Sequence, residues 1–247
     1  MIKVRVYFSP QHIDELLLRD KTIVVIDVLR ASTTITYAMA AGAREIIPVG
    51  SVDQAMKIVG NLFSTSTILC GERGGKRIEG FKLGNSPAEY TPESVDGKSL
   101  ILTTTNGAVA LTKSKYARHC FISSFVNLSA SVRAIHELPD LQETGLTIIC
   151  SGREDDFSLE DATCAGLLIA ALSNLRELEL TDSAKTVLSI AKEYGNDILT
   201  TLQQSDHGKY LTSIGFADDI VTASTIDTLP LVPVLEQNAI KKKLIFN

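Results

Sequence analysis

An aspartate and an arginine stand directly after an apolar run near the start of the chain, where they could act on an anion. Asp27 follows the run Thr22–Ile26, Arg30 comes three residues later, and the hydroxyl residues Ser32 and Thr33 follow. If a helix begins among these hydroxyls, its free N–H groups and Arg30 would hold a phosphate or a carboxylate. Asp27 could bind a metal ion or accept a proton. The alternative is that Ser32 or Thr33 only caps the helix and that Asp27 is only a turn residue.

A second turn repeats this pattern. Thr104, Thr105 and Asn106 follow the apolar run Ser99–Thr103 and precede Gly107. Hydroxyl groups and free N–H groups at such a turn can bind an anion, and two such turns at neighbouring strand ends would form one pocket. The alternative is a helix cap joined to an Asn-Gly turn.

A third turn, which follows another apolar run, is strongly acidic. Arg153 and five carboxylates fall within the nine residues that end at Asp161. Carboxylates this dense repel one another unless a cation offsets them, so we expect a divalent metal ion here, with Glu160 and Asp161 as ligands together with Asp27. The same residues also fit a helix cap at Ser158 with acidic residues in the first helical turn, which needs no metal.

A long glycine-rich loop, residues 71–89, lies between the first two turns. Its five glycines give the backbone freedom, and its lysines and arginines concentrate positive charge in an otherwise acidic chain. The polar residues of this loop that we expect to bind an anionic substrate are Arg73, Lys76, Arg77, Asn85 and Ser86. The spacing is not that of a P-loop, because an arginine follows Lys76 where Ser or Thr is required. The loop is interpreted as a lid over an anion, and a solvated flexible loop is the alternative.

One of the four histidines lies in a polar cluster. His207 follows Asp206 and precedes a glycine and a lysine. A histidine in such a setting is a candidate for proton transfer, and Asp206 beside it is a second candidate. A plain turn explains the same residues equally well.

Two known phosphatase mechanisms do not match the spacing. A cysteine phosphatase needs an arginine six residues after its cysteine, and neither Cys70 nor Cys150 has one. A phosphoaspartyl mechanism of the haloacid-dehalogenase kind expects a second aspartate two positions after the first, where Leu29 follows Asp27.

The elements that must position these residues alternate along the chain for some 170 residues. Apolar runs rich in β-branched residues predict strands at Lys3–Tyr7, Thr22–Ile26, Glu45–Val49, Thr67–Cys70, Ser99–Thr103, Arg118–Ile122 and Leu146–Cys150. Helical spacing predicts helices at Gln11–Leu18, Thr33–Ala41, Val52–Asn61, Gly107–Ser114, Asn127–His136 and Leu159–Leu175. Parallel strands need helical crossovers, so this alternation predicts an α/β fold with three α/β/α layers and a mostly parallel or mixed sheet.

The regular alternation of predicted strands and helices ends at about residue 175. Asp182–Glu193 and Asn196–Gln204 look helical, Ile220–Ala223 and Leu231–Pro233 are weaker strand or loop segments, and Lys241–Phe246 is a basic and apolar tail. No linker rich in Pro, Gly or Ser divides the chain. We therefore treat residues 1–247 as one unit, with a second lobe or a helical cap after about residue 175 as an open alternative.

The composition argues against a protein that binds nucleic acid or an anionic membrane. About 45% of the 247 residues are hydrophobic and the formal net charge is −5, so the chain has no general attraction to nucleic acid or to an anionic membrane. The N-terminal segment lacks the pattern of a signal peptide or a spanning helix, and we expect a cytoplasmic protein. The four cysteines are too few for a disulfide framework and are expected to be thiols. The sequence leaves the oligomeric state open.

Four segments together resemble the 2-phosphosulfolactate phosphatase family. They are Ile26–Ile35, Gly71–Tyr90, Thr103–Leu111 and Cys150–Gly166, and they keep their order over most of the chain. The resemblance implies a cytoplasmic, magnesium-dependent phosphatase that hydrolyses 2-phospho-3-sulfolactate to 3-sulfolactate and phosphate, a step of coenzyme M biosynthesis. It also implies an α/β fold of its own type.

The residues fit such a substrate, because burying a phosphate, a sulfonate and a carboxylate demands several cations and N–H donors. In the mechanism that we expect, Asp27 with Glu160 or Asp161 holds Mg²⁺ against a phosphate oxygen. Arg30 and Arg153 stabilise the charge of the transferring phosphoryl group.

The remaining residues complete this mechanism. The turn Thr104–Asn106 assists the two arginines, while Arg73 and Lys76 hold the sulfonate or the carboxylate. Asp206 or His207 protonates the leaving alkoxide or orients water. The sequence leaves open whether water attacks directly or a phosphoenzyme forms.

Three alternatives stay open. The true substrate could be a related small phosphate ester, because resemblance fixes a reaction class better than a substrate. The chain could be a non-catalytic protein that binds a polyanionic metabolite, although such a protein gains nothing from Asp27 and five more acids unless they hold a metal. Finally, residues 154–156 could be a solvated acidic loop with the activity elsewhere in the pocket.

Overall fold

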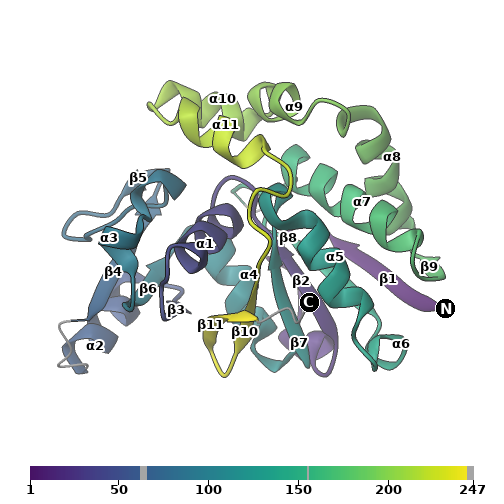
Figure 1. Ribbon diagram of the computed structural model, residues 1–247, viewed down its shortest axis with the longest axis horizontal. Coiled ribbons are helices and arrows are strands. Elements are labelled where there is room, and N and C mark those ends of the chain that lie inside the picture. Colours follow the sequence, from purple (N-terminus) through teal and green to yellow (C-terminus); the bar gives the residue numbers. More distant parts are fainter. Residues whose placement is uncertain (62–65, 155, 244–247) are drawn as a thin grey trace.

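The computed structural model describes residues 1–61, 66–154 and 156–243, and it has the predicted α/β fold (Figure 1). Its strands are β1 Ile2–Tyr7, β2 Thr22–Ile26, β3 Glu45–Pro48, β4 Thr67–Arg73, β5 Lys76–Arg77, β6 Ser99–Thr103, β7 His119–Ser123, β8 Leu146–Cys150, β9 Leu178–Leu180, β10 Val232–Glu236 and β11 Ala239–Lys243. Asp155 of the acidic turn and residues 244–246 of the predicted tail lie outside the described residues.

Helices separate most of these strands and cover the sheet. They are α1 Ala31–Ala40, α2 Val52–Asn61, α3 Pro92–Val95, α4 Gly107–Lys113, α5 Leu128–His136, α6 Leu141–Thr144, α7 Leu159–Ser173, α8 Asp182–Tyr194, α9 Ile198–Gln204, α10 Asp206–Ser213 and α11 Ala217–Ser224. Short 3₁₀ helices occur at Glu15–Leu18, Pro87–Glu89, Ser114–Tyr116 and Phe125–Asn127. The predicted helix Gln11–Leu18 is wrong in its first half, because the side chain of Asp14 accepts a hydrogen bond from the N–H of Leu16 and starts the 3₁₀ turn there.

The sheet consists of two parallel blocks joined by an antiparallel hairpin. Its strand order is β5-β4-β6-β3-β11-β10-β7-β2-β8-β1-β9. Strands β4, β6 and β3 run parallel, as do β7, β2, β8, β1 and β9. The hairpin β10–β11 stands between the blocks and pairs antiparallel with β7 on one side and β3 on the other. The mixed sheet is therefore parallel within each block, antiparallel at the junction, and antiparallel again where β5 pairs with β4 at one edge.

Strand β2 is buried on both faces, as the inner strand of a three-layer fold must be. Val24 and Ile26 join a hydrophobic core with residues of α5 and α7. Ile23 and Val25, which point to the opposite face, join a second core with residues of α1 and α4. This packing places the residue that follows Ile26 at the carboxyl edge of the sheet, between the helix layers.

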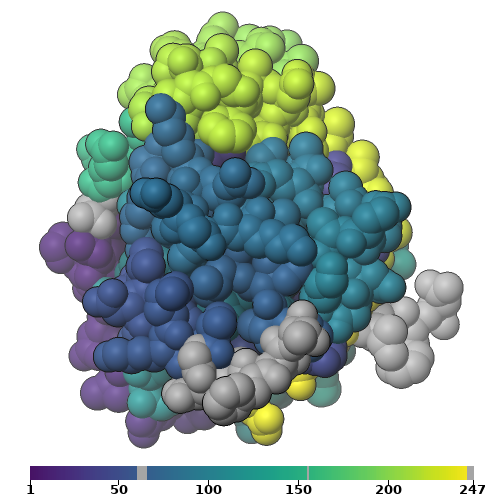
Figure 2. All heavy atoms as spheres, turned by 90° about the vertical axis from the view of Figure 1, so that its left-hand side faces the viewer, coloured from purple at the N-terminus to yellow at the C-terminus, as the bar shows by residue number. Residues whose placement is uncertain are grey.

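The segment after residue 175, for which the sequence suggests a second lobe or a helical cap, adds β9 to one sheet edge, forms helices α8 to α11 and ends in the hairpin. Figure 1 shows α9, α10 and α11 above the sheet, and Figure 2 shows α10 and α11 seated on the segment that contains β4 and β5. Ile220–Ala223, predicted as strand or loop, is helical because Ile220 and Ala223 bury one face of α11 while Asp218 lies exposed in its first turn. The predicted tail begins within β11.

All four cysteines are free and buried, as expected. A search of the described helices finds none with the length and apolar character needed to cross a bilayer.

Candidate active site

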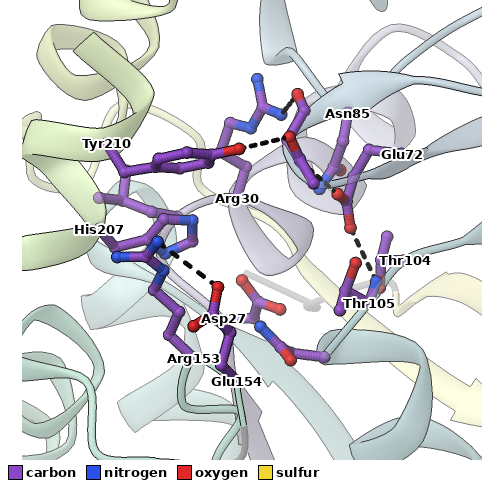
Figure 3. A pocket seen from close by; sticks show the side chains of 14 residues that line it. Asp27, Arg30, Glu72, Asn85, Thr104, Thr105, Arg153, Glu154, His207 and Tyr210 are labelled. Atoms are coloured by element: carbon purple, nitrogen blue, oxygen red, sulfur yellow. Dashed lines mark hydrogen bonds and ion pairs between the residues drawn. The ribbon is translucent and has the colours of Figure 1, made fainter. Parts of the chain in front are cut away.

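A pocket opens at the carboxyl edge of the sheet, where the predicted turns converge under α10 (Figure 3). Its volume is about 80 Å³, several times the roughly 10–15 Å³ that one water molecule needs. The lining residues are Asp27, Leu29, Arg30, Glu72, Gly74, Gly75, Asn85, Thr104, Thr105, Asn106, Arg153, Glu154, His207 and Tyr210. Eight of these fourteen residues are among the site residues predicted from the sequence: Asp27, Arg30, Asn85, Thr104, Thr105, Asn106, Arg153 and His207.

Both parallel blocks contribute to this pocket. Asp27 follows β2 and Arg153 follows β8, and these strands belong to one block. Glu72 lies on β4 and Thr104 follows β6, which belong to the other block. The pocket therefore spans the two halves of the sheet, as expected for ligand sites at the carboxyl edge of α/β sheets.

Asp27 is buried at the base of the pocket. Its Oδ1 accepts a hydrogen bond of 3.1 Å from the N–H of Ala31, at the start of α1, and its own N–H donates to Oγ of Ser32. Burial raises the pKa of Asp27 from 3.8 to about 6, the charge of His207 acts against this rise, and the charges of nearby carboxylates add to it. The carboxylate of Asp27 thus titrates within the range of ordinary working pH.

Ser32 and Thr33, which we expected to bind substrate, instead brace the turn that carries Asp27. Ser32 is the acceptor for the Asp27 N–H, and Oγ1 of Thr33 donates to the backbone carbonyl of Val28 at 2.8 Å. Both side chains are buried, and neither lines the pocket.

Asp161 and Glu160 lie behind Asp27 on the first turn of α7, and neither lines the pocket. The two oxygens of Asp161 accept hydrogen bonds from the N–H groups of Val28 at 2.8 Å and Gly152 at 3.1 Å. Burial and then the charge of Asp27 raise the pKa of Asp161 well above its usual value. Asp161 therefore fastens the two turns after β2 and β8 to each other.

Glu160 pairs with His207 across the gap between α7 and α10. Oε1 of Glu160 lies 3.3 Å from Nδ1 of His207, and both side chains are largely buried. Burial alone would raise the pKa of Glu160, but contact with His207 and its charge outweigh burial, so the pKa lies below its ordinary value. The pair fixes the ring of His207 at the pocket wall, on the first turn of a helix rather than in a plain turn.

Glu72 is a pocket residue that the sequence did not single out. It is 7% exposed, and its oxygens accept hydrogen bonds from the N–H of Gly75 at 2.8 Å and the N–H of Thr105 at 2.7 Å. A single carboxylate therefore joins the glycine-rich loop to the turn after β6. The available signal was its position two residues after the predicted strand Thr67–Cys70, at the carboxyl edge of the sheet.

The cations of the glycine-rich loop lie outside the pocket lining. Arg73, Lys76 and Arg77 are exposed on the β4–β5 hairpin. From the same loop, Asn85 lines the pocket, and its buried Oδ1 has no hydrogen-bond partner among the described residues. The hydroxyl of Ser86 donates to Asp219 instead of facing the pocket.

Arg153 and Tyr210 form one wall together. The guanidinium of Arg153 lies 4.7 Å from the ring centroid of Tyr210, and it donates to the backbone carbonyl of Asp206. The hydroxyl of Tyr210 donates to the carbonyl of Gly74 at 2.9 Å, which ties α10 to the glycine-rich loop. The carboxylate of Asp206 itself is 95% exposed, and Asp206 does not line the pocket.

The charges of the lining favour a cation. The lining has three carboxylates, Asp27, Glu72 and Glu154, and two guanidiniums, and both guanidiniums already have a carboxylate partner. Arg30 pairs with Asp219 at 2.7 Å and Arg153 pairs with Glu154 at 3.6 Å, which leaves Asp27 and Glu72 without a cationic partner from these arginines. The oxygen-rich lining suits a hard cation such as Mg²⁺, which typically takes one or two carboxylates and completes its shell with water and substrate. Within residues 1–61, 66–154 and 156–243, no three His, Cys, Asp or Glu side chains form a ready-made metal site.

The chain is similar over most of its length to one family of known proteins. A family model described as 2-phosphosulpholactate phosphatase matches residues 7–238. A protein of Caldanaerobacter subterraneus subsp. tengcongensis described as a probable 2-phosphosulfolactate phosphatase is 35% identical over 238 residues, which cover 96% of this chain and 97% of the relative. Proteins with the same description from Carboxydothermus hydrogenoformans and Clostridium acetobutylicum are each 37% identical, over 94% of this chain and 92% and 97% of their own lengths.

Proposed function

Since the chain belongs to the 2-phosphosulfolactate phosphatase family, we propose that it hydrolyses 2-phospho-3-sulfolactate to 3-sulfolactate and phosphate. The family match confirms the resemblance that the four sequence segments predicted. The observation that carries the proposal is the convergence of Asp27, His207 and Arg153 in one pocket from three distant parts of the chain. A phosphomonoesterase needs such a set: an acidic centre, a proton donor and a cation beside the phosphoryl group.

Mg²⁺ is the proposed cofactor. In this proposal Asp27 is its pocket ligand, and Glu160 and Asp161 lie behind Asp27 as part of its support. The excess of lining carboxylates over unpaired lining cations supports it, because an anionic ester would otherwise meet a negative pocket. A bound Mg²⁺ supplies charge neutralisation at the phosphoryl oxygens.

The side chains of the pocket divide the remaining work. Arg153 binds phosphoryl oxygens, and the hydroxyls of Thr104 and Thr105 and the side-chain amide of Asn106 provide further donors, whereas the N–H of Thr105 is already bound to Glu72. His207, oriented by Glu160, donates a proton to the leaving alkoxide. The exposed carboxylate of Asp206 has no part in this scheme.

The substrate has further anionic groups besides the phosphate. Asn85 is the proposed contact at the loop side of the pocket, where its side-chain amide N–H groups can donate to an anionic group, while its unpartnered buried Oδ1 can accept a hydrogen bond from a bound water. Arg73, Lys76 and Arg77 act at the outer rim in this scheme, since they are exposed and outside the lining. A cytoplasmic location and a place in coenzyme M biosynthesis belong to the same proposal.

The test is phosphate release from racemic 2-phospho-3-sulfolactate, compared with phospholactate and with an aryl phosphate, each with Mg²⁺ and with EDTA. We expect release that depends on Mg²⁺ and is fastest with the sulfonated ester. Equal rates with phospholactate would show that the proposed substrate is wrong, although the phosphatase reaction would still hold. Tight calorimetric binding of all three esters without any release would reject the enzyme and support a binding protein.

A further inference from the structure

Arg30 is a pocket residue whose charge is already matched within the protein. Its side chain is 2% exposed, and one terminal nitrogen lies 2.7 Å from Oδ2 of Asp219 on α11. The other terminal nitrogen donates to the backbone carbonyl of Gly75, and the guanidinium lies 4.2 Å from the ring centroid of Phe216. These contacts fix the guanidinium at the pocket wall, where Figure 3 shows it near Tyr210.

Asp219 is held as firmly as its partner. Its side chain is 5% exposed, and its Oδ1 accepts a hydrogen bond of 2.6 Å from the hydroxyl of Ser86. One carboxylate therefore links α11 to the turn after β2 and to the glycine-rich loop. Asp219 does not itself line the pocket, so any effect on a ligand passes through Arg30.

The ion pair between Arg30 and Asp219 bears on how a phosphatase releases its product, inorganic phosphate. A guanidinium buried without a counter-charge attracts anions strongly, because little water screens it. Inorganic phosphate, the product of a phosphatase, would then leave slowly. With Asp219 beside it, Arg30 keeps N–H groups that can donate, since a guanidinium has five of them, while much of its net attraction for an anion is cancelled.

We propose that Asp219 is a positioning residue that holds Arg30 at the pocket wall and sets how tightly the site retains inorganic phosphate. The proposal rests on the proposed phosphatase function and adds to it a residue that governs product release.

The experiment compares Asp219→Asn with Asp218→Asn. Asp218 is the neighbouring residue of α11 and is exposed, so its variant removes the same charge from the protein surface. Calorimetry with inorganic phosphate at fixed Mg²⁺ measures binding directly, and steady-state kinetics give KM, kcat and the inhibition constant of phosphate. For Asp219→Asn we expect phosphate to bind about tenfold tighter or more, with KM and kcat both lower. Asp218→Asn should match the wild type within twofold.

Unchanged or weaker phosphate binding in Asp219→Asn would overturn the proposal. A role in packing alone would lower the melting temperature by the same amount with and without phosphate, whereas the proposal expects a larger phosphate-induced rise in the variant. Because phosphate binding requires no turnover, a chain that binds phosphate but hydrolyses no ester rejects only the phosphatase function.

A second pair of variants covers the case in which Asp219→Asn does not fold. Arg30→Gln alone leaves the charge of Asp219 unmatched, and we expect it to weaken phosphate binding at least tenfold. The double variant Arg30→Gln with Asp219→Asn removes both charges, and its phosphate binding should return to within about threefold of the wild type. If the double variant binds as weakly as Arg30→Gln, Asp219 has no influence on the anion and the proposal fails.

Discussion

The carboxylate of Asp27 lies directly against Gly107, the first residue of α4: a Cβ atom at position 107 would stand 2.6 Å from Oδ2 of Asp27. The same Cβ would come within 2.7 Å of Cβ of Ala31. The Asn-Gly pair after β6 therefore does more than cap a helix, because the missing side chain makes room for the central carboxylate of the pocket.

We predict that Gly107→Ala displaces the Asp27 carboxylate and lowers kcat/KM at least tenfold, since sub-ångström errors in a catalytic group are costly. The matched control is Gly50→Ala, where an added Cβ meets only Oε1 of Gln54 at an ordinary 3.6 Å. Both variants are assayed for phosphate release and for melting temperature. Normal activity in Gly107→Ala would show that the placement of Asp27 does not matter.

Asp27→Asn should abolish activity and yet stabilise the protein at neutral pH. The pKa of Asp27 is raised from 3.8 to about 6 in the fold, so the ionised carboxylate disfavours folding above pH 6, and this cost disappears below the unfolded pKa. Removing the charge should raise the free energy of unfolding at pH 7.5 by up to about 3 kcal/mol, with the gain vanishing near pH 4. Thermal unfolding in EDTA at pH 7.5 and at pH 4 measures this gain in the free energy of unfolding. A gain that persists at pH 4 would contradict the raised pKa of Asp27.

Glu72→Gln should loosen the glycine-rich loop and shift the pH profile. A glutamine can accept only one of the two N–H hydrogen bonds that Glu72 accepts, from Gly75 and Thr105, so stability should fall by about 1–3 kcal/mol and KM should rise. The charge of Glu72 also raises the pKa of Asp27. The acid limb of the activity profile should therefore move to lower pH in the variant.

Glu79→Gln is the matched control for Glu72→Gln, since Glu79 is exposed in the same loop. Its stability, KM and pH profile should equal those of the wild type. A profile that moves equally in both variants would assign the shift to the overall charge of the loop instead of to Glu72.

The two candidates for the general acid can be separated by the leaving group. In His207→Asn, kcat for an alkyl phosphate should fall about 10²–10⁴-fold, while kcat for an aryl phosphate, whose leaving group needs little protonation, should fall far less. Asp206→Asn should leave both rates unchanged, because its carboxylate is 95% exposed and Asp206 does not line the pocket. An equal loss with both esters in His207→Asn would argue for a binding role of the ring.

The sequence predicts the fold where a signal is local. Strands such as Thr22–Ile26 and Ser99–Thr103 are continuous β-branched runs, and the polar residues after them mark the carboxyl edge of the sheet. The sequence does not predict the hairpin β10–β11 in this way. Its strands are short, and they fit into the sheet only by pairing with β7 and β3, which are distant in the sequence. The prediction of a strand or loop at Ile220–Ala223, in helix α11, is wrong because four residues that include Ile and Val are too few to distinguish a strand from a helix.

The residues of the candidate site also differ in whether a local sequence signal predicts them. Asp27 and Thr104 are predictable because each directly follows a strand, and Arg153 comes three residues after β8. Tyr210 and Asp219 lie on helices of ordinary composition more than fifty residues further on. Only the three-dimensional packing of α10 and α11 brings Tyr210 to the pocket wall and Asp219 against Arg30. No spacing rule connects Asp219 with Arg30.

The position of the hairpin sets the order in which the protein can be completed. Both parallel blocks leave the ribosome before β10 and β11, and each block carries only part of the pocket. During synthesis the two partial sites have no strand to hold them in register, because β3 and β7 do not pair with each other. The strands that join the two blocks are therefore the last to be synthesised, and the sheet cannot be complete until residues 232–243 have been made.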